Sequence, residues 1–335
     1  MKRLVQIAVA LVTIVIILGA YTRLTDAGLG CPDWPGCYGF ATVPTDEARM
    51  QAAQEAFPTA NIDHAKAWNE MIHRYAAGIL GLVIFAIVTL AIRRRMKGEK
   101  DKPFKHPLFL GGLIIFQAAL GMWTVTMMLQ PAIVMGHLLG GFTTFSLLTL
   151  LYLRESNFQP SPVDTPLRKI LPFCVLTLVL IACQIALGGW VAANYAALAC
   201  TELPICQGNW AENLEVVGAF TLEEADTYEF GIHPYEERMT MHVFHRIGAI
   251  FVTVAVLTLL SLLWRKAQTR WFTSMAAIIT FLLVAQITLG VLNVTLSLPL
   301  FVAVAHNFVG ALLLVSVLVL TYAIYKLDRK EVIHG

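Results

Sequence analysis

Long apolar runs dominate the chain, and polar residues fall mainly in the connections between them. A transmembrane helix needs about 20 mostly apolar residues, and eight segments meet that requirement. They lie approximately at 4–22, 69–92, 107–129, 132–153, 170–193, 240–264, 271–294 and 300–325. The pattern predicts an all-α membrane protein of eight transmembrane helices. Prolines follow the two shortest connections, at Gln130-Pro131 and Ser297-Leu298-Pro299, where a proline can begin a helix.

Composition agrees with a membrane protein. Of the 335 residues, 57% are hydrophobic and 14% are charged, whereas soluble domains carry roughly 25% charged residues. Most of the 24 lysines and arginines fall on the side of both termini, which we therefore expect to be cytoplasmic. This orientation places the two long loops, about 24–66 and 194–238, on the periplasmic side. The net charge of +2, without a basic tract, argues against nucleic-acid binding.

Local sequence signals add detail to the long loops and to the first span. Each long loop contains a short polar stretch typical of a helix start, at Thr45–Glu47 and at Thr221–Glu224. A signal peptide is the alternative for the first segment, because Lys2 and Arg3 precede it. Its apolar stretch exceeds the usual 7–15 residues, and no clean cleavage site follows, so a transmembrane helix is favoured.

The two halves of the chain match each other at an offset of about 170 residues. The matching landmarks occur in the same order and are Gly19, Cys31, Cys37, His73-Arg74, Gln117 with Gly121, and His137, against Gly188, Cys200, Cys206, His245-Arg246, Gln286 with Gly290, and His306. A duplication explains this order. We predict two tandem pseudo-symmetric four-helix bundles, at 1–155 and 168–330, which share orientation because each has an even number of spans.

Four histidines lie within predicted spans, where ionisable residues are rare and usually functional. They are His73, His137, His245 and His306, and each lies roughly 10 Å or less inside the outer end of its helix. Each half thus presents two imidazoles at matched depth on two helices, which favours a haem iron. A zinc ion would lack two of its four ligands. The histidines expected to be solvated are His64, His106, His233 and His334.

Charged residues beside these histidines distinguish the two halves. Arg74 and Arg246 directly follow a ligand candidate, so they are candidates for haem propionate contacts, with interfacial snorkelling as the alternative. Glu70 and His242 both stand three residues before a ligand candidate, on the same helix face. A desolvated carboxylate needs a partner or a protonation role. We therefore expect proton chemistry in the N-terminal half, which contains Glu70. The alternative is that Glu70 is an interfacial residue at the helix entrance.

The cysteines divide into two outer-loop pairs and two helix residues. Cys31 with Cys37, and Cys200 with Cys206, lie on the predicted oxidising side, where disulfides are expected. Their spacing fits structural cross-links and also a thiol pair that exchanges electrons. Cys174 and Cys183 fall in the fifth span, and we expect both to be inert core residues.

The sequence resembles the haem A synthase family of cytochrome oxidase assembly over nearly the whole chain. The segments that carry the resemblance are Gly19–Tyr38, Asn69–Arg74, Gln117–Gly121, Met135–His137, His242–Arg246 and Ala305–Asn307. The first of these segments is quite specific, whereas the four histidines are specific only in combination.

The resemblance implies an oxidoreductase of the bacterial inner membrane. Its substrate would be haem O, whose C8 methyl group is oxidised by successive hydroxylations to the formyl group of haem A, for use in terminal oxidases. His73 and His137 would be axial ligands of the substrate haem, and His245 and His306 those of an iron-containing haem b cofactor. Glu70 would be essential to catalysis. A haem O synthase is the implied supplier, the membrane electron acceptor is not indicated, and a homo-oligomer stays open.

Three other classes compete with this interpretation. A dihaem b-type, quinone-linked electron-transfer protein shares the paired histidines but does not predict a glutamate in only one half. A periplasmic thiol-oxidising protein gives no reason for four matched histidines. A transporter would be expected to show broken helices, which the spans do not indicate.

Overall fold

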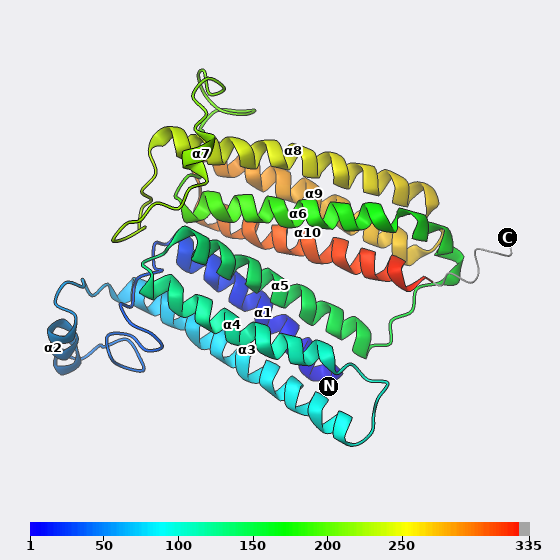
Figure 1. Cartoon of the computed structure of the whole chain (residues 1–335), viewed down its shortest axis with the longest axis horizontal. Coiled ribbons are helices and arrows are strands. Elements are labelled where there is room, and N and C mark those ends of the chain that lie inside the picture. Colours follow the sequence, from blue (N-terminus) through cyan, green and yellow to red (C-terminus); the bar gives the residue numbers. More distant parts are fainter. Residues whose placement is uncertain (328–335) are drawn as a thin grey trace. The chain divides into compact units, whose positions relative to one another are not determined.

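The computed structural model describes residues 1–327, and within that range it contains helices, loops and a single isolated bridge between Cys37 and Phe40 but no strand. Eight helices are long and apolar enough to cross a membrane, as predicted. They are α1 (Lys2–Leu24), α3 (His64–Met96), α4 (Lys105–Thr126), α5 (Pro131–Glu155), α6 (Leu171–Ala193), α8 (Tyr235–Lys266), α9 (Arg270–Thr295) and α10 (Leu300–Lys326) (Figure 1). The chain is therefore an all-α, multi-pass membrane protein.

Two tight joins connect α4 to α5 and α9 to α10. Each join contains a pair of non-glycine residues in the left-handed region, Met128 and Leu129 at φ 51° and 64°, and Ser297 and Leu298 at 56° and 62°. Pro131 is the first residue of α5, and Pro299 is the N-cap of α10. The predicted role of proline at both helix starts is confirmed.

Short helices lie in the long loops. In α2 (Glu47–Ala56), the Asp46 side chain caps the helix by accepting a hydrogen bond from Arg49 N at 3.0 Å. Hydrogen bonds from Arg49 lower the pKa of Asp46. The helix start expected at 45–47 is confirmed, whereas the one expected at 221–224 is wrong. The second loop has a single turn, α7 (Val216–Ala219), and then a chain without helix, since acidic residues rather than an apolar stripe follow position 221.

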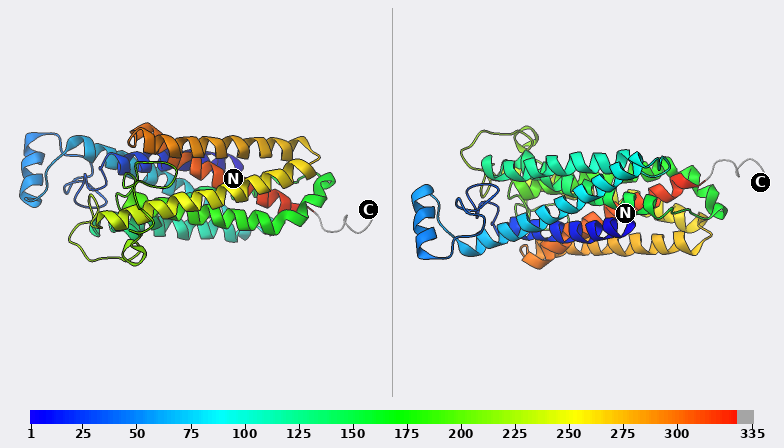
Figure 2. Two further views of the ribbon diagram at one scale, coloured as in Figure 1. Left: turned by 90° about the horizontal axis from the view of Figure 1, so that it is seen from above. Right: turned by 90° about the horizontal axis from the view of Figure 1, so that it is seen from below.

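The chain forms two compact units, which we describe separately. Unit 1 comprises residues 1–148, 192–195 and 220–233, and unit 2 comprises 149–191, 196–219 and the described residues from 234 onward. In unit 1, α3 packs against α1 and α4; in unit 2, α9 packs against α8 and α10. Within each unit the long helices run lengthwise beside one another in both views of Figure 2. The sequence halves 1–155 and 168–330, and their pseudo-symmetry, stay predictions.

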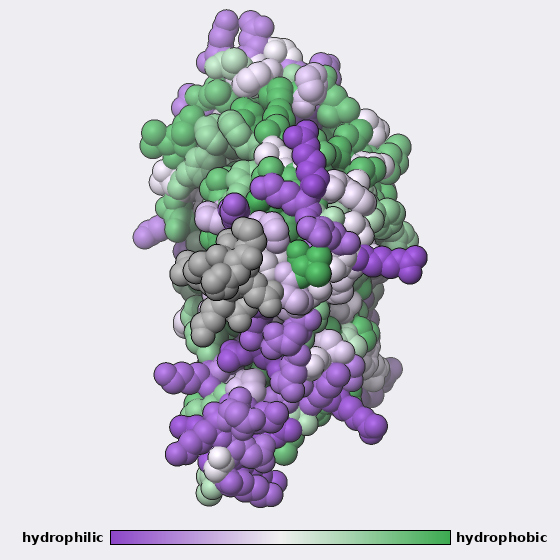
Figure 3. All heavy atoms as spheres, turned by 90° about the vertical axis from the view of Figure 1, so that its right-hand side faces the viewer, coloured by the Kyte–Doolittle hydropathy of each residue, from purple (hydrophilic) through white to green (hydrophobic). Residues whose placement is uncertain are grey.

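Large apolar side chains cover the helix flanks, as lipid contact requires. Leu82 and Phe281 are each 71% exposed, whereas Phe272 and Leu259 are buried in the core of unit 2. At the helix ends away from the disulfide loops, hydrophilic side chains gather beside apolar flanks (Figure 3). Basic residues of this end include Arg93, Arg94 and Arg95 in the last turn of α3.

Two expectations about single residues are wrong. Cys183, expected in the core, is exposed, because it lies on the outward face of α6; Cys174 is buried. His233, expected to be solvated, is only 4% exposed. His64 begins α3 and His106 lies in the first turn of α4, and both are half-buried. His334, together with Arg329 and Lys330 of the predicted cytoplasmic end, lies outside the described residues.

Candidate functional site

The two histidines of unit 1 pack closely against glycines of neighbouring helices. A Cβ atom at Gly19 of α1 would lie 2.9 Å from Cε1 of His73 in α3. A Cβ atom at Gly121 of α4 would lie 3.3 Å from Cε1 of His137 in α5. Each imidazole therefore lies against a helix backbone at a place where any side chain would displace it.

Unit 2 repeats these contacts. A Cβ atom at Gly188 of α6 would lie 2.9 Å from Cε1 of His245 in α8, and one at Gly290 of α9 would lie 3.2 Å from Cε1 of His306 in α10. The histidine and glycine landmarks of the sequence thus have a common physical meaning. In both units, glycine lets an imidazole approach the neighbouring helix axis.

The imidazoles of unit 1 face one another. The ring centroids of His73 and His137 are 6.4 Å apart, and the rings are nearly perpendicular, at 85°. Two metal–imidazole bonds of about 2 Å each would separate the bonding nitrogens by about 4 Å, and the ring centroids, which lie behind them, by more. Nδ1 of each ring is buried and has no hydrogen-bond partner among the described residues. The pair fits one iron held between the rings.

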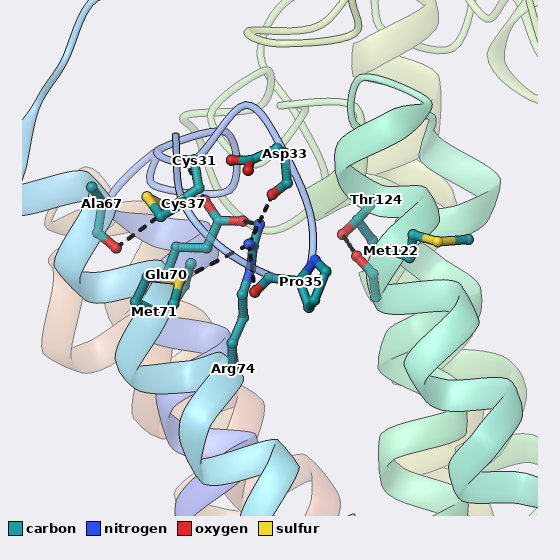
Figure 4. A network of polar contacts seen from close by, with 12 residues as sticks. Cys31, Asp33, Pro35, Cys37, Ala67, Glu70, Met71, Arg74, Met122 and Thr124 are labelled. Atoms are coloured by element: carbon teal, nitrogen blue, oxygen red, sulfur yellow. Dashed lines mark hydrogen bonds and ion pairs between the residues drawn. A yellow bond between two sulfur atoms is a disulfide. The ribbon is translucent and has the colours of Figure 1, made fainter. Parts of the chain in front are cut away.

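Glu70 joins α3 to the disulfide loop of unit 1 (Figure 4). The structure links Cys31 to Cys37, and the main-chain N–H of Cys31 donates to Oε2 of Glu70 at 2.8 Å. Oε1 of Glu70 forms an ion pair with Arg74, one turn further along α3. Arg74 also donates to the loop carbonyls of Asp33, Pro35 and Gly36. Glu70 is only 5% exposed, so this is a buried carboxylate whose two oxygens both accept from donors.

His242 has the same place in unit 2 that Glu70 has in unit 1. The main-chain N–H of Cys200, linked to Cys206, lies 3.3 Å from Nδ1 of His242. Nε of Arg246 lies 3.2 Å from Nε2 of the same ring, and because a neutral imidazole has a single acceptor nitrogen, the ring accepts from one of these two donors at a time. Arg246 also donates to the carbonyls of Cys200, Glu202 and Ile205. The two units therefore hold their disulfide loops through equivalent positions, and the imidazole of unit 2 accepts one of the two hydrogen bonds that the carboxylate accepts in unit 1.

The arginines are directed to these loops. The guanidinium groups of Arg74 and Arg246 bind loop carbonyls in the structure, and a haem propionate contact by either residue stays a prediction. Arg74 is well covered, with 12% of its side chain exposed. In the structure both arginines attach a disulfide loop to a long helix, a role that the sequence did not suggest.

Asp33 and Tyr38 shape the loop above Glu70. The Asp33 carboxylate accepts from Tyr38 N at 2.6 Å and from Gly39 N at 2.8 Å, and Tyr38 has a positive φ of 55°. The Tyr38 hydroxyl donates to the Asn61 carbonyl at 3.2 Å. Burial raises the pKa of Tyr38 above its usual value, and the negative charge of Glu70 adds to the effect. The phenol therefore stays protonated and keeps this bond at neutral pH.

Sequence reasoning missed one residue at the unit 2 site. Gln184 stands four residues before Gly188, as Gln117 stands before Gly121 and Gln286 before Gly290. Its Nε2 donates to the His245 carbonyl at 2.8 Å. The shared spacing of glutamine and glycine was the available signal.

Fold and sites together define a class: a multi-pass helical membrane protein with a histidine pair and a disulfide loop in each of two units. The family of the cytochrome oxidase assembly protein matches residues 2–318, and the chain belongs to this family. A Heme A synthase of Shewanella oneidensis is 47% identical over 96% of both chains. Heme A synthases of Halalkalibacterium halodurans and Rickettsia prowazekii are 26% and 25% identical to this chain. Both alignments cover 96% of this chain, and they cover 94% and 96% of the two relatives, respectively. These relatives do not favour the quinone-linked cytochrome.

Proposed function

We propose that the protein is a haem A synthase, an oxidoreductase that converts the C8 methyl group of haem O into a formyl group. The similarity to a Heme A synthase over nearly the full length supports the activity. One structural observation supports the placement of the chemistry in unit 1: a buried carboxylate, Glu70, stands where unit 2 has His242.

The histidine pairs supply the binding sites in this proposal. His73 and His137 hold haem O as the substrate, and their facing rings leave room for its iron. His245 and His306 hold haem b, whose iron supplies one-electron transfer when it is bound. The glycines opposite these rings keep the space beside the imidazoles free of side chains. A propionate bound by Arg74 or Arg246 would replace one of the loop carbonyls.

The chemistry assigned to Glu70 is proton transfer. Conversion of a methyl group to a formyl group takes up one water and releases four protons and four electrons. In the proposed route, water attacks the oxidised methyl carbon in two rounds, and the resulting geminal diol loses water. Glu70 accepts a proton from the attacking water or stabilises the positive charge that develops. The electrons pass to an acceptor in the membrane.

Location and partners follow from the same proposal. The positive-inside bias of the sequence supports both termini in the cytoplasm and the two disulfide loops in the periplasm of a bacterial inner membrane. Oxidising conditions there suit the bonds Cys31–Cys37 and Cys200–Cys206. A haem O synthase in the same membrane would supply the substrate.

Haem extraction from cells that express the protein with a haem O source tests the activity. We expect haem A, haem O and haem b on chromatography; haem b alone would instead support the electron-transfer alternative. Glu70→Ala should retain bound haem and accumulate haem O or a partly oxidised form, and normal haem A output would remove Glu70 from the mechanism. Labelled water should enter the formyl group, and an oxygen derived wholly from O₂ would exclude the water route.

A further inference from the structure

The residue four positions before each histidine-facing glycine is a glutamine in three helices and a valine in the fourth. The glutamines are Gln117 in α4, Gln184 in α6 and Gln286 in α9, and the valine is Val15 in α1. In all four cases the main chain of this residue approaches the paired imidazole. The four positions are therefore equivalent in space, and only the side chain differs.

Both imidazoles of unit 2 have an amide partner. Nε2 of Gln184 donates to the His245 carbonyl at 2.8 Å and lies 2.9 Å from Nδ1 of the same residue. Nε2 of Gln286 lies 3.3 Å from Nε2 of His306. Each contact joins the ligand helix to its neighbour at the level of the imidazole, so the amide restricts how the ring can move.

The imidazoles of unit 1 are less supported. Nε2 of Gln117 is buried and has no hydrogen-bond partner in the described part of the chain. Val15 offers His73 no amide at all. Of the four histidines, His73 is therefore the one whose neighbouring helix supplies only an apolar side chain at this position.

The ligand helices differ in the same way. Glycine receives each glutamine: a Cβ atom would lie 1.6 Å from Nε2 of Gln117 at Gly140, 2.2 Å from Oε1 of Gln184 at Gly248, and 3.4 Å from Nε2 of Gln286 at Gly310. Gly140 and Gly248 stand three residues after their histidines and Gly310 stands four after His306, and the two corresponding positions of α3 are Ala76 and Ala77. Between α1 and α3, therefore, neither the glutamine nor the glycine of this contact is present.

We infer that the glutamines are positioning residues for the histidine ligands, and that His73 is the ligand that can leave a bound iron. Side chains that orient a ligand typically change metal affinity about 10–100-fold when they are removed. Unit 2 then keeps both ligands on a resident cofactor, whereas unit 1 has a ligand that yields when haem O enters and haem A departs. The inference rests on the proposed function, because it requires haem between the histidines.

Carbon monoxide is the probe for a test, since it binds ferrous haem only where an axial position opens. The full-length protein is purified with haem, reduced and titrated with carbon monoxide. His245→Ala with His306→Ala removes both ligands of unit 2 and confines the measurement to unit 1, and His73→Ala with His137→Ala confines it to unit 2. We expect unit 1 haem to bind carbon monoxide at least about 10-fold more tightly than unit 2 haem.

Val15→Gln combined with Ala76→Gly gives α1 and α3 the pattern of the other helix pairs. This variant should lower the carbon monoxide affinity of unit 1 about 10-fold or more and keep its ferric haem low-spin. The matched control, Val15→Leu with Ala76→Gly, should behave as the wild type. Gln184→Val should have the reverse effect, opening unit 2 haem to carbon monoxide.

The outcomes separate the inference from the function on which it rests. Equal carbon monoxide affinities in the two wild-type units, or an unchanged affinity in the glutamine variant, would overturn the inference and leave a haem A synthase standing. A wild-type protein that binds no haem would overturn the proposed function itself. If the glutamine variant cannot be produced, Gln184→Val decides, and an unchanged unit 2 affinity refutes the positioning role.

Discussion

Glu70→His should separate the attachment of the disulfide loop from the chemistry proposed for the carboxylate. Unit 2 already contains the substituted arrangement: His242 lies within hydrogen-bond distance of the Cys200 N–H and of Arg246 and accepts from one of them. A histidine at position 70 can take the same place between Cys31 and Arg74. The loop should therefore stay in place while the acidic group is lost.

The structure allows the two substitutions to be compared in magnitude. Glu70→Ala leaves the buried N–H of Cys31 without its acceptor, which costs about 1–3 kcal/mol. Arg74 keeps its loop carbonyls, so the full penalty of about 3–5 kcal/mol for an orphaned buried charge does not apply. We expect about 2–3 kcal/mol for Glu70→Ala and under about 1 kcal/mol for Glu70→His. At about 2–4 °C per kcal/mol, the alanine variant should melt about 4–12 °C lower.

The assay combines thermal unfolding of the detergent-solubilised protein, proteolysis of the loop and haem chromatography. Glu70→His should resist protease like the wild type and melt within a few degrees of it, yet accumulate haem O. Wild-type haem A output from Glu70→His would refute the requirement for a carboxylate. A loss of loop protection equal to that of Glu70→Ala would refute the structural equivalence of Glu70 and His242.

Three further predictions follow from single contacts. Gly19→Ala should displace the imidazole opposite and reduce haem bound in unit 1 about 10-fold or more, measured by absorption spectra, whereas Gly78→Ala, whose Cβ would meet no described atom within 4 Å, should not. Asp164→Ala should destabilise unit 2 by about 1–3 kcal/mol, because this carboxylate accepts from the main chain between α8 and α9; an unchanged melting temperature would contradict it. Cys200→Ser with Cys206→Ser should lose about 2 kcal/mol of loop stability but still form haem A in the haem extraction assay, and abolished synthesis with an intact loop would indicate electron exchange.

The eight membrane helices could be predicted because their signals are local. The length of an apolar run and the restriction of proline to a helix start act within one segment, as Pro131 shows. Helix extensions beyond the apolar run were underestimated: α3 begins at His64, where Asp63 caps it by accepting from Ala65 N and Lys66 N. A polar cap of this kind lies outside any window that measures hydrophobicity.

The site was only partly predictable. The spacing of the sequence repeat indicated the four histidines and showed that His242 stands where the first half has Glu70. Both features can be found from residue type and position in the repeat alone. The contact between Arg74 and the loop carbonyls joins residues 38–41 positions apart, and nothing local to either segment indicates it. The burial of His233 is likewise a tertiary property, because a place in a loop by itself indicates exposure.

The contacts show two differences between unit 1 and unit 2, and both lie next to the imidazole of His73. Glu70 lies one turn before His73 on α3, and Val15 approaches the same ring from α1. On the proposed function, a resident cofactor needs two firmly held ligands and no proton acceptor beside it. A substrate that enters, loses protons and leaves as product needs an acceptor and a ligand that yields. Since Glu70 meets the first need and the absence of a glutamine opposite His73 meets the second, a single division of labour between the two units accounts for both differences.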